Sequence, residues 1–237
     1  MDSAILLNWN IRGLGKEVNK KILRDTIFKC KPSVICIQET KVQNINAKQL
    51  VDLWPNVKPH GFCQASIGQS GGLVSTWDSV LYKLINYDNF FNWLGMTLQC
   101  KKSGLIFSIF NIYAPLLSKE REINSSNLKE IHLINASYTW IGPAGRRSRI
   151  DRALVNSAWY QQGAWVSKAL YRKNSDHRPL LILLDEVNRG PKPFGFFNIW
   201  LKDPNSKNIM LSFLKETKDL GARDVQQILK VFKSKTK

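Results

Sequence analysis

Hydrophobic periodicity divides the first 40 positions of the chain into a strand, a helix and a second strand. Residues 4–10 form an apolar run that ends in polar Asn10, which predicts a buried strand. In residues 20–30 the apolar side chains fall on one helical face with Lys and Arg opposite, and Pro32 ends this helix. Residues 33–40 again have the pattern of a buried strand. Such a strand–helix–strand unit is typical of a layered α/β domain.

The middle of the chain has a different pattern, in which short apolar runs alternate with Gly, Asn, Asp and Ser. This pattern favours antiparallel strands and hairpins. We expect five such strands, at residues 61–65, 72–77, 81–87, 96–100 and 105–113. Residues 116–135 are polar, with a short helical patch and no strong strand, and residues 179–184 form the last predicted strand.

The composition changes after residue 186. Residues 188–193 contain Gly and two Pro and predict a linker. Residues 194–200 hold an aromatic cluster, and amphipathic helical stretches follow it up to residue 237. We therefore expect one large domain, residues 1–187, and an appended linker with a helical tail, residues 188–237.

The chain is strongly basic, with 35 Lys and Arg against 18 Asp and Glu and a formal net charge of +17. This charge favours a polyanionic partner such as nucleic acid or an acidic membrane surface, although a basic surface can also serve solubility alone. No apolar run is long enough to span a bilayer, and residues 4–7 are too few for a signal peptide. We expect an intracellular protein, nuclear or cytoplasmic, with no membrane partner and no obligate protein partner.

The four cysteines are Cys30, Cys36, Cys63 and Cys100. They have no Cys-x-x-Cys spacing and lie in apolar or strand-like surroundings, so free thiols are expected rather than disulfides or zinc ligands. The content of 43% hydrophobic residues excludes a disordered chain and allows a sizeable core.

Polar side chains stand at the ends of several predicted strands. Asp176 and His177 come just before the last strand, a pair that can bind a divalent metal and orient a phosphate. Alone, such a pair is more often a solvated turn. Asn10, Glu39 and Asp151 stand at comparable strand ends, which favours a shared functional site.

Two further groups are candidates for phosphate contacts. Tyr113 ends the strand at residues 105–113 near the same expected edge, although it could also be a core tyrosine. Arg149 and Arg152 flank Asp151, which suits an anion-binding site as well as a solvated basic loop.

Seven short motifs follow one another along residues 5–185: Trp9-Asn10-Ile11-Arg12-Gly13, Gln38-Glu39-Thr40, Ser70-Gly71-Gly72-Leu73, Asn111-Ile112-Tyr113-Ala114-Pro115, Thr139-Trp140, Ser148-Arg149-Ile150-Asp151-Arg152 and Ser175-Asp176-His177-Arg178-Pro179-Leu180. In this order they resemble the endonuclease/exonuclease/phosphatase family, and most of all the endonuclease domain of plant LINE-type (non-LTR) retrotransposons. Residues 193–201 are similar to the segment that joins this endonuclease to the reverse transcriptase.

The resemblance implies a four-layer α/β sandwich, with two mixed β-sheets flanked by helices, and hydrolysis of phosphodiester bonds in DNA. It implies Mg²⁺ as the cofactor, with Mn²⁺ as a possible substitute. Glu39 would be the main metal ligand with Asn10 beside it, and Asp176 a second metal or water ligand. His177 would contact the scissile phosphate, with its imidazole oriented by Asp151.

The remaining site residues follow from the same resemblance. Tyr113 would donate a hydrogen bond on the phosphate side. Arg12, Arg149 and Arg152 are expected to bind the substrate.

The chain departs from the family between residues 116 and 138. There the family carries a helix, a central strand that ends in Gly-Asp-x-Asn and a second helix, whereas this chain has 23 residues without that motif. The family's Asp activates water and its Asn stabilises the phosphate, so their joint loss is expected to cost several orders of magnitude in rate. Glu130 lies in a helical, charged context that favours a solvated face. An incomplete sheet with unpaired edges is expected.

Three functional hypotheses follow. The first is a retrotransposon-derived, Mg²⁺-dependent DNA endonuclease that has become degenerate, with weak or no activity. The second is a nucleic-acid-binding protein without catalysis, which rests on the net charge. The third is a phosphatase of a small phosphorylated substrate that uses the same site.

Overall fold

The computed structural model describes residues 5–67, 70–90, 92–113, 128–161 and 163–184. The chain divides into two units, Met1–Glu186 and Val187–Lys237, and all described residues belong to the first. The predicted linker and helical tail therefore lie outside the described residues, as do residues 116–127 of the segment in which the expected Gly-Asp-x-Asn motif is missing. No helix in the described part is long and apolar enough to cross a membrane.

The predicted strand–helix–strand unit is confirmed. Strand β1 (Leu6–Asn10) leads through helix α1 (Glu17–Cys30) to strand β2 (Val34–Gln38), and β1 and β2 pair in parallel. All five residues of β2 are buried. This explains the continuous apolar run in the sequence, because a strand with both faces covered has no polar side.

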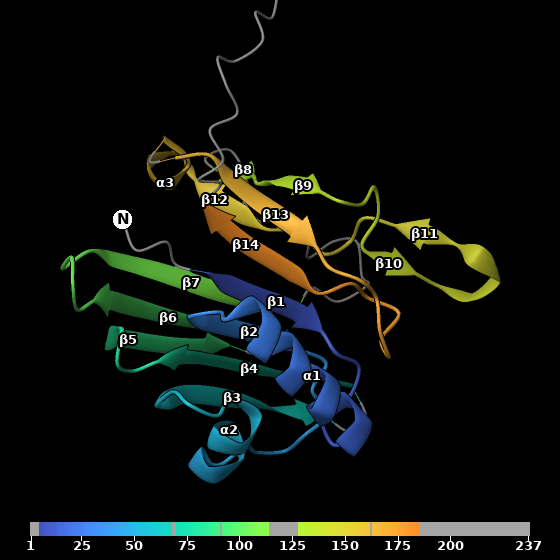
Figure 1. The fold of residues 1–237 in the computed structure, drawn as a ribbon, viewed down its shortest axis with the longest axis horizontal. Helices are drawn as coiled ribbons and strands as arrows, with labels where there is room; N and C mark the ends of the chain where they lie inside the picture. The colour runs from blue at the N-terminus through green and yellow to red at the C-terminus, as the bar shows by residue number, and fades with distance from the viewer. Residues whose placement is uncertain (1–4, 68–69, 91, 114–127, 162, 185–237) are drawn as a thin grey trace, which may run out of the picture. The chain divides into compact units, whose positions relative to one another are not determined.

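A seven-stranded mixed sheet forms the centre of the domain. Its strand order is β3-β4-β2-β1-β14-β13-β9, in which only the β1/β2 and β13/β9 pairs are parallel. The strands not yet introduced are β3 (Pro59–Ile67), β4 (Ser70–Asp78), β14 (Leu180–Leu184), β13 (Trp165–Ala169) and β9 (His132–Ile134). Helices α1 and α2 (Ala47–Leu53) lie over one face of this sheet (Figure 1).

A second, three-stranded antiparallel sheet packs on the other face. It consists of β5 (Tyr82–Phe90), β6 (Trp93–Cys100) and β7 (Ile106–Ile112). Val34 and Cys36 of β2 lie in one apolar cluster with Met96 and Leu98 of β6. The described part of the domain is therefore an α/β sandwich of two sheets, as the sequence predicts, with α1 and α2 on the large mixed sheet and a second sheet that is smaller and wholly antiparallel.

Residues 128–161 form short elements, of which the sequence pattern indicated only the strand that follows Asp151. They are β8 (Leu128–Glu130), β10 (Trp140–Ile141), a 3-10 turn (Pro143–Gly145), β11 (Arg147–Ser148), β12 (Leu154–Asn156) and α3 (Ser157–Gln161). The helical context expected for Glu130 is wrong. Glu130 ends a strand in which it pairs with Leu154, and its carboxylate contacts Arg149. A pairing this distant in sequence leaves no local signal.

Candidate active site

One end of the large sheet gathers the polar side chains that the sequence singles out. Asn10 ends β1 and Glu39 follows β2, and since these strands are parallel, both residues leave the sheet at the same edge. Strand β14 runs antiparallel to β1, with Leu180 opposite Asn8. His177, which precedes β14, is therefore brought to the edge that Asn10 reaches.

Glu39 accepts hydrogen bonds from two of its predicted partners. Its Oε1 accepts from Asn10 Nδ2 at 3.0 Å and from the Tyr113 hydroxyl at 3.3 Å. Its side chain is only 12% exposed. Burial, together with the negative charge of Glu39, raises the pKa of the Tyr113 phenol. Tyr113 therefore keeps its proton and acts as a donor at this site.

His177 and Asp151 form a second pair at the same edge. His177 Nδ1 lies 2.9 Å from both carboxylate oxygens of Asp151, and the imidazole is 5% exposed. The backbone N–H of Asp151 donates to Thr139 Oγ1 at 3.0 Å. The backbone N–H of His177 donates to Ser175 Oγ at 3.1 Å. Both partners are thus fixed at the backbone, which sets the orientation of the imidazole.

Arg12 joins the two pairs. Its Nε lies 3.1 Å from Asp176 Oδ1 and 3.5 Å from Glu39 Oε2. The other oxygen of Asp176 accepts a hydrogen bond from Trp140 Nε1 at 2.8 Å, and His177 Nε2 is 3.9 Å from Asp176 Oδ1. Glu39 and His177, which are 138 positions apart in sequence, therefore belong to one connected cluster of charged groups.

The backbone at this edge is strained. Arg12 and Glu39 both have left-handed conformations, with φ of 53° and 49°. Each such non-glycine residue costs about 1–2 kcal/mol. The strain is held by paired backbone bonds, among them Gly13 N–H to the Glu39 carbonyl at 2.8 Å. Strain of this kind is concentrated at functional sites.

Gly72 allows the loop after β2 to approach β4. It has a φ of 85°, and its carbonyl accepts from Thr40 N–H at 3.1 Å. A Cβ at this position would clash with Thr40 Oγ1. The glycine pair in this motif therefore serves a close backbone approach directly behind Glu39.

Arg149 and Arg152 lie apart from this cluster of contacts. Both pair with Glu130, Arg149 Nη2 at 2.7 Å and Arg152 Nη1 at 3.8 Å. Their side chains are 36% and 58% exposed, so they remain accessible to solvent. Substrate binding by these two arginines stays a prediction, as does the same role for Arg12.

Asn111 is a residue of the site region that the sequence reasoning did not single out. It is 2% exposed, and its Nδ2 donates to the carbonyls of Ile37 and Val74 at 3.2 and 3.1 Å. Its Oδ1 accepts from Gln38 Nε2. These bonds tie β7 to the large sheet two residues before Tyr113. The sequence did contain a signal for this residue, namely an amide side chain within a strand of alternating apolar residues.

The donor set at Glu39 suits a hard divalent cation. Within the described ranges no three His, Cys, Asp or Glu side chains form a metal-binding group. However, Asn10 Oδ1 is buried without a hydrogen-bond partner, and it belongs to the amide that contacts Glu39. One carboxylate with one amide oxygen leaves room for waters and a phosphate, the ligand set that Mg²⁺ commonly takes. Asp176, which the sequence predicts as a second metal or water ligand, contacts Arg12 in this structure.

No further carboxylate of this cluster is free to activate water. In the described part of the chain, its carboxylates are Glu39, Asp151 and Asp176, and each contacts a cationic group or an imidazole. The whole sequence has no aspartate between Asp88 and Asp151.

The two sheets and the helices on the large sheet have the endonuclease/exonuclease/phosphatase fold. The chain is similar to the AP endonuclease LMAP from Leishmania major, with 13% identity, a TM-score of 0.60 and coverage of 77% of this chain and 87% of that one. It is also similar to D. rerio TDP2 complexed with a single-strand DNA product, at 12% identity and a TM-score of 0.54, with 78% of this chain and 100% of that one covered.

A third similar structure is the endonuclease domain of TRAS1, a telomere-specific non-LTR retrotransposon. It has 12% identity and a TM-score of 0.52, and the match covers 77% of this chain and 98% of that one. The sequence itself matches no protein-family model and no curated protein. At these identities the likeness establishes the fold.

Proposed function

We propose that this chain is a retrotransposon-derived DNA endonuclease domain that keeps its metal and phosphate groups but has lost the residue that activates water. One observation carries the proposal: Glu39 with Asn10 and His177 with Asp151 lie in a single cluster joined through Arg12 and Asp176. Such a cluster suits a phosphodiester, which needs charge stabilisation on several oxygens at once.

Glu39 and Asn10 are the residues that would hold Mg²⁺, which supplies charge stabilisation to the phosphate when bound. His177 is held through Nδ1 by Asp151, which leaves Nε2 to face a phosphate oxygen, to which it would donate a hydrogen bond when the imidazole carries both protons. Tyr113, whose raised pKa keeps it protonated, is a second donor on the same side.

DNA is the favoured substrate. The net charge of +17 suits a polyanion, and three of the similar structures are an AP endonuclease, TDP2 with a DNA product and a retrotransposon endonuclease. Without an aspartate between Asp88 and Asp151, the attacking water lacks its general base. The expected loss from this step alone is about 10²–10⁴ in rate.

Metal binding and plasmid nicking test the proposal. We expect about one Mn²⁺ per chain by electron paramagnetic resonance, competed by Mg²⁺ and lost in Glu39→Ala. Glu17→Ala, an exposed carboxylate on α1, is the matched control and should bind metal normally. Supercoiled plasmid with Mg²⁺ should be nicked slowly or not at all, against an EDTA blank.

The outcomes separate the parts of the proposal. Rapid nicking that Glu39→Ala abolishes would show an intact catalytic site and overturn the degeneracy. Equal Mn²⁺ binding by wild type and Glu39→Ala would overturn the metal assignment.

Nucleic-acid binding without catalysis is the second candidate, and the net charge favours it. It predicts salt-sensitive DNA binding that neither EDTA nor Glu39→Ala changes. Under the endonuclease proposal, Mg²⁺ should instead strengthen the binding of DNA, because a cation held by Glu39 and Asn10 would supply positive charge beside a phosphate.

A further inference from the structure

A cleft opens at the other end of the sandwich from the candidate active site. It has a volume of about 410 Å³ and lies where edge strand β3 of the large sheet faces edge strand β5 of the small one. Trp77 of β4 lies beside it opposite Val34, the first residue of β2, whereas Glu39 follows the last residue of that strand. The five residues of β2 therefore separate the cleft from the cluster around Glu39.

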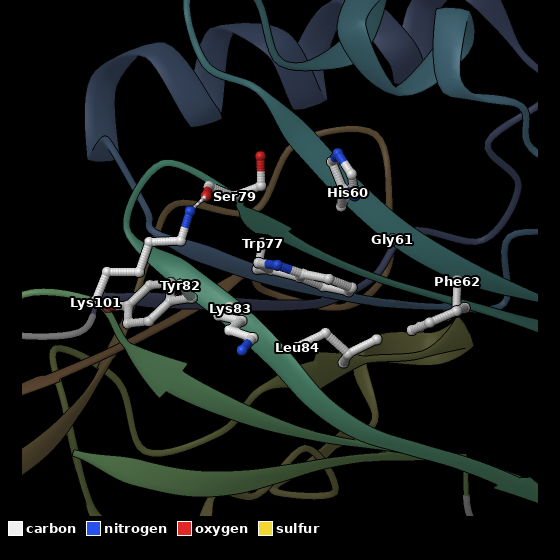
Figure 2. A pocket seen from close by; sticks show the side chains of 9 residues that line it. All are labelled: His60, Gly61, Phe62, Trp77, Ser79, Tyr82, Lys83, Leu84 and Lys101. Atoms are coloured by element: carbon white, nitrogen blue, oxygen red, sulfur yellow. Dashed lines mark hydrogen bonds between the residues drawn. The ribbon is translucent and has the colours of Figure 1, made fainter. Parts of the chain in front are cut away.

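The wall of the cleft is aromatic (Figure 2). The rings of His60 and Phe62 lie 6.2 and 5.7 Å from that of Trp77, centroid to centroid. Phe62 in turn stacks on Tyr87 at 3.7 Å. His60 and Phe62 are two positions apart on β3, so their side chains lie on the same face of this strand, the face toward the small sheet. Leu84 of β5 lines the cleft on the side of the small sheet. The result is an apolar slot between two sheets, in which the rings of His60 and Phe62 are tilted by 50° and 39° against that of Trp77.

Two lysines stand at the rim of this slot. Lys83 and Lys101 line the cleft, and Lys101 Nζ donates a hydrogen bond to the Ser79 carbonyl at 2.7 Å, as Figure 2 shows. That bond holds the Lys101 ammonium at the mouth. Neither lysine has a carboxylate within ion-pair distance among the residues described. An aromatic wall with uncompensated positive charge at its mouth suits a ligand that is aromatic at one end and anionic at the other.

We propose that this cleft binds a nucleotide unit of single-stranded nucleic acid, with the base in the aromatic slot and the phosphate at Lys83 and Lys101. Its volume lies in the range of small-molecule sites, about 300–1,000 Å³. Stacking on aromatic side chains combined with lysine contacts to the backbone is the general way in which single strands are held without sequence preference. The proposal does not depend on hydrolysis at Glu39.

Binding of a fluorescein-labelled ten-nucleotide thymidine strand, followed by fluorescence anisotropy over a range of salt concentrations, tests this assignment. The variant Lys83→Gln/Lys101→Gln should bind more weakly, and its plot of log affinity against log salt should be shallower by about 0.7, because one phosphate contact is lost. Lys21→Gln/Lys29→Gln on α1 removes the same charge elsewhere and should change the slope little. His60→Ala should weaken binding without a change in slope, because it removes a stacking ring rather than a charge.

Ultraviolet cross-linking of a bromouridine-substituted strand locates the contact directly. We expect mass spectrometry to find the adduct on β3 or β4, at His60, Phe62 or Trp77. Thermal melting of each variant checks that it is folded. Thymidine monophosphate can be added as a competitor of the labelled strand. If it displaces the strand, the cleft binds single nucleotides through the same contacts.

Two results would overturn the proposal. One is an equal loss of affinity in the two double-lysine variants, which would mean diffuse charge attraction. The other is cross-linking confined to peptides around Glu39 and Tyr113. Glu39→Ala separates this proposal from the endonuclease one, since it should leave strand binding at the cleft unchanged.

Discussion

Glu39 illustrates how a single residue carries both chemistry and strain. Its carboxylate has three polar neighbours, and its φ of 49° places it where glycine is favoured.

The strain can be measured by comparing two substitutions at the same position. Glu39→Gly should have a higher free energy of unfolding than Glu39→Ala, by about 1 kcal/mol, because only glycine adopts this φ without cost. Asp52→Gly and Asp52→Ala, in helix α2, should show the opposite order, since glycine is the poorer helix former by about 1 kcal/mol. Urea denaturation gives both differences. The same order at the two positions would contradict a strained Glu39.

Cys36 gives a pH dependence at the residue scale. All four cysteines are free, and complete burial raises the pKa of the Cys36 thiol to about 12 from an ordinary value of 9.0. The unfolded chain therefore ionises first as the pH rises, so this contribution to stability is intact below pH 9 and is lost between pH 9 and 12. From pH 8 to pH 10, wild type should lose about 1 kcal/mol more than Cys36→Ala in urea unfolding. Parallel losses would show that the thiol is accessible.

At the scale of the elements, the two sheets are joined by one buried amide as well as by apolar packing. Asn111 of β7 contacts the backbone of both β2 and β4 and the side chain of Gln38. Buried polar groups of this kind fix one arrangement of the elements, because any other would leave them unpaired.

Asn111→Ala should lower the free energy of unfolding by about 2–3 kcal/mol, since several buried hydrogen bonds are lost at once. Asn89→Ala, on an exposed position of β5, is the matched control and should change it by less than about 0.5 kcal/mol. Because Tyr113 follows β7, the first variant should also weaken Mn²⁺ binding at Glu39. An unchanged stability would mean that apolar packing alone sets the arrangement of the sheets.

At the scale of the whole molecule, the charge of +17 should dominate the affinity for DNA. If Arg12, Arg149 and Arg152 each contact a phosphate, the affinity for duplex DNA should fall about 40-fold between 50 and 200 mM salt, from a slope of about 0.9 per contact. Arg149→Gln/Arg152→Gln should make the slope shallower by about 1.8.

The double variant Lys21→Gln/Lys29→Gln is again the control for charge alone. Fluorescence anisotropy with a labelled duplex measures both slopes. An unchanged slope in Arg149→Gln/Arg152→Gln would show that Glu130 keeps these arginines from the DNA, since both already pair with it.

The sequence alone determined the local pattern of this protein. Apolar periodicity located β1, α1, β2 and the strands from β3 to β7, because the spacing of hydrophobic residues depends on whether one or both faces of an element are buried. The motifs at strand ends also marked Asn10, Glu39, Tyr113, Asp151 and His177, since strand ends leave polar groups at the edge of a sheet.

Only the tertiary structure decided which of these groups meet. The pairing of β14 with β1 across more than 160 residues brings His177 to Glu39, and no local pattern encodes that choice. The same holds for Arg12 between two carboxylates, for Glu130 against Arg149 and for the cleft between β3 and β5. Strand pairing, charge contacts and clefts depend on distances through space, whereas hydrophobic spacing reports only whether a residue is buried.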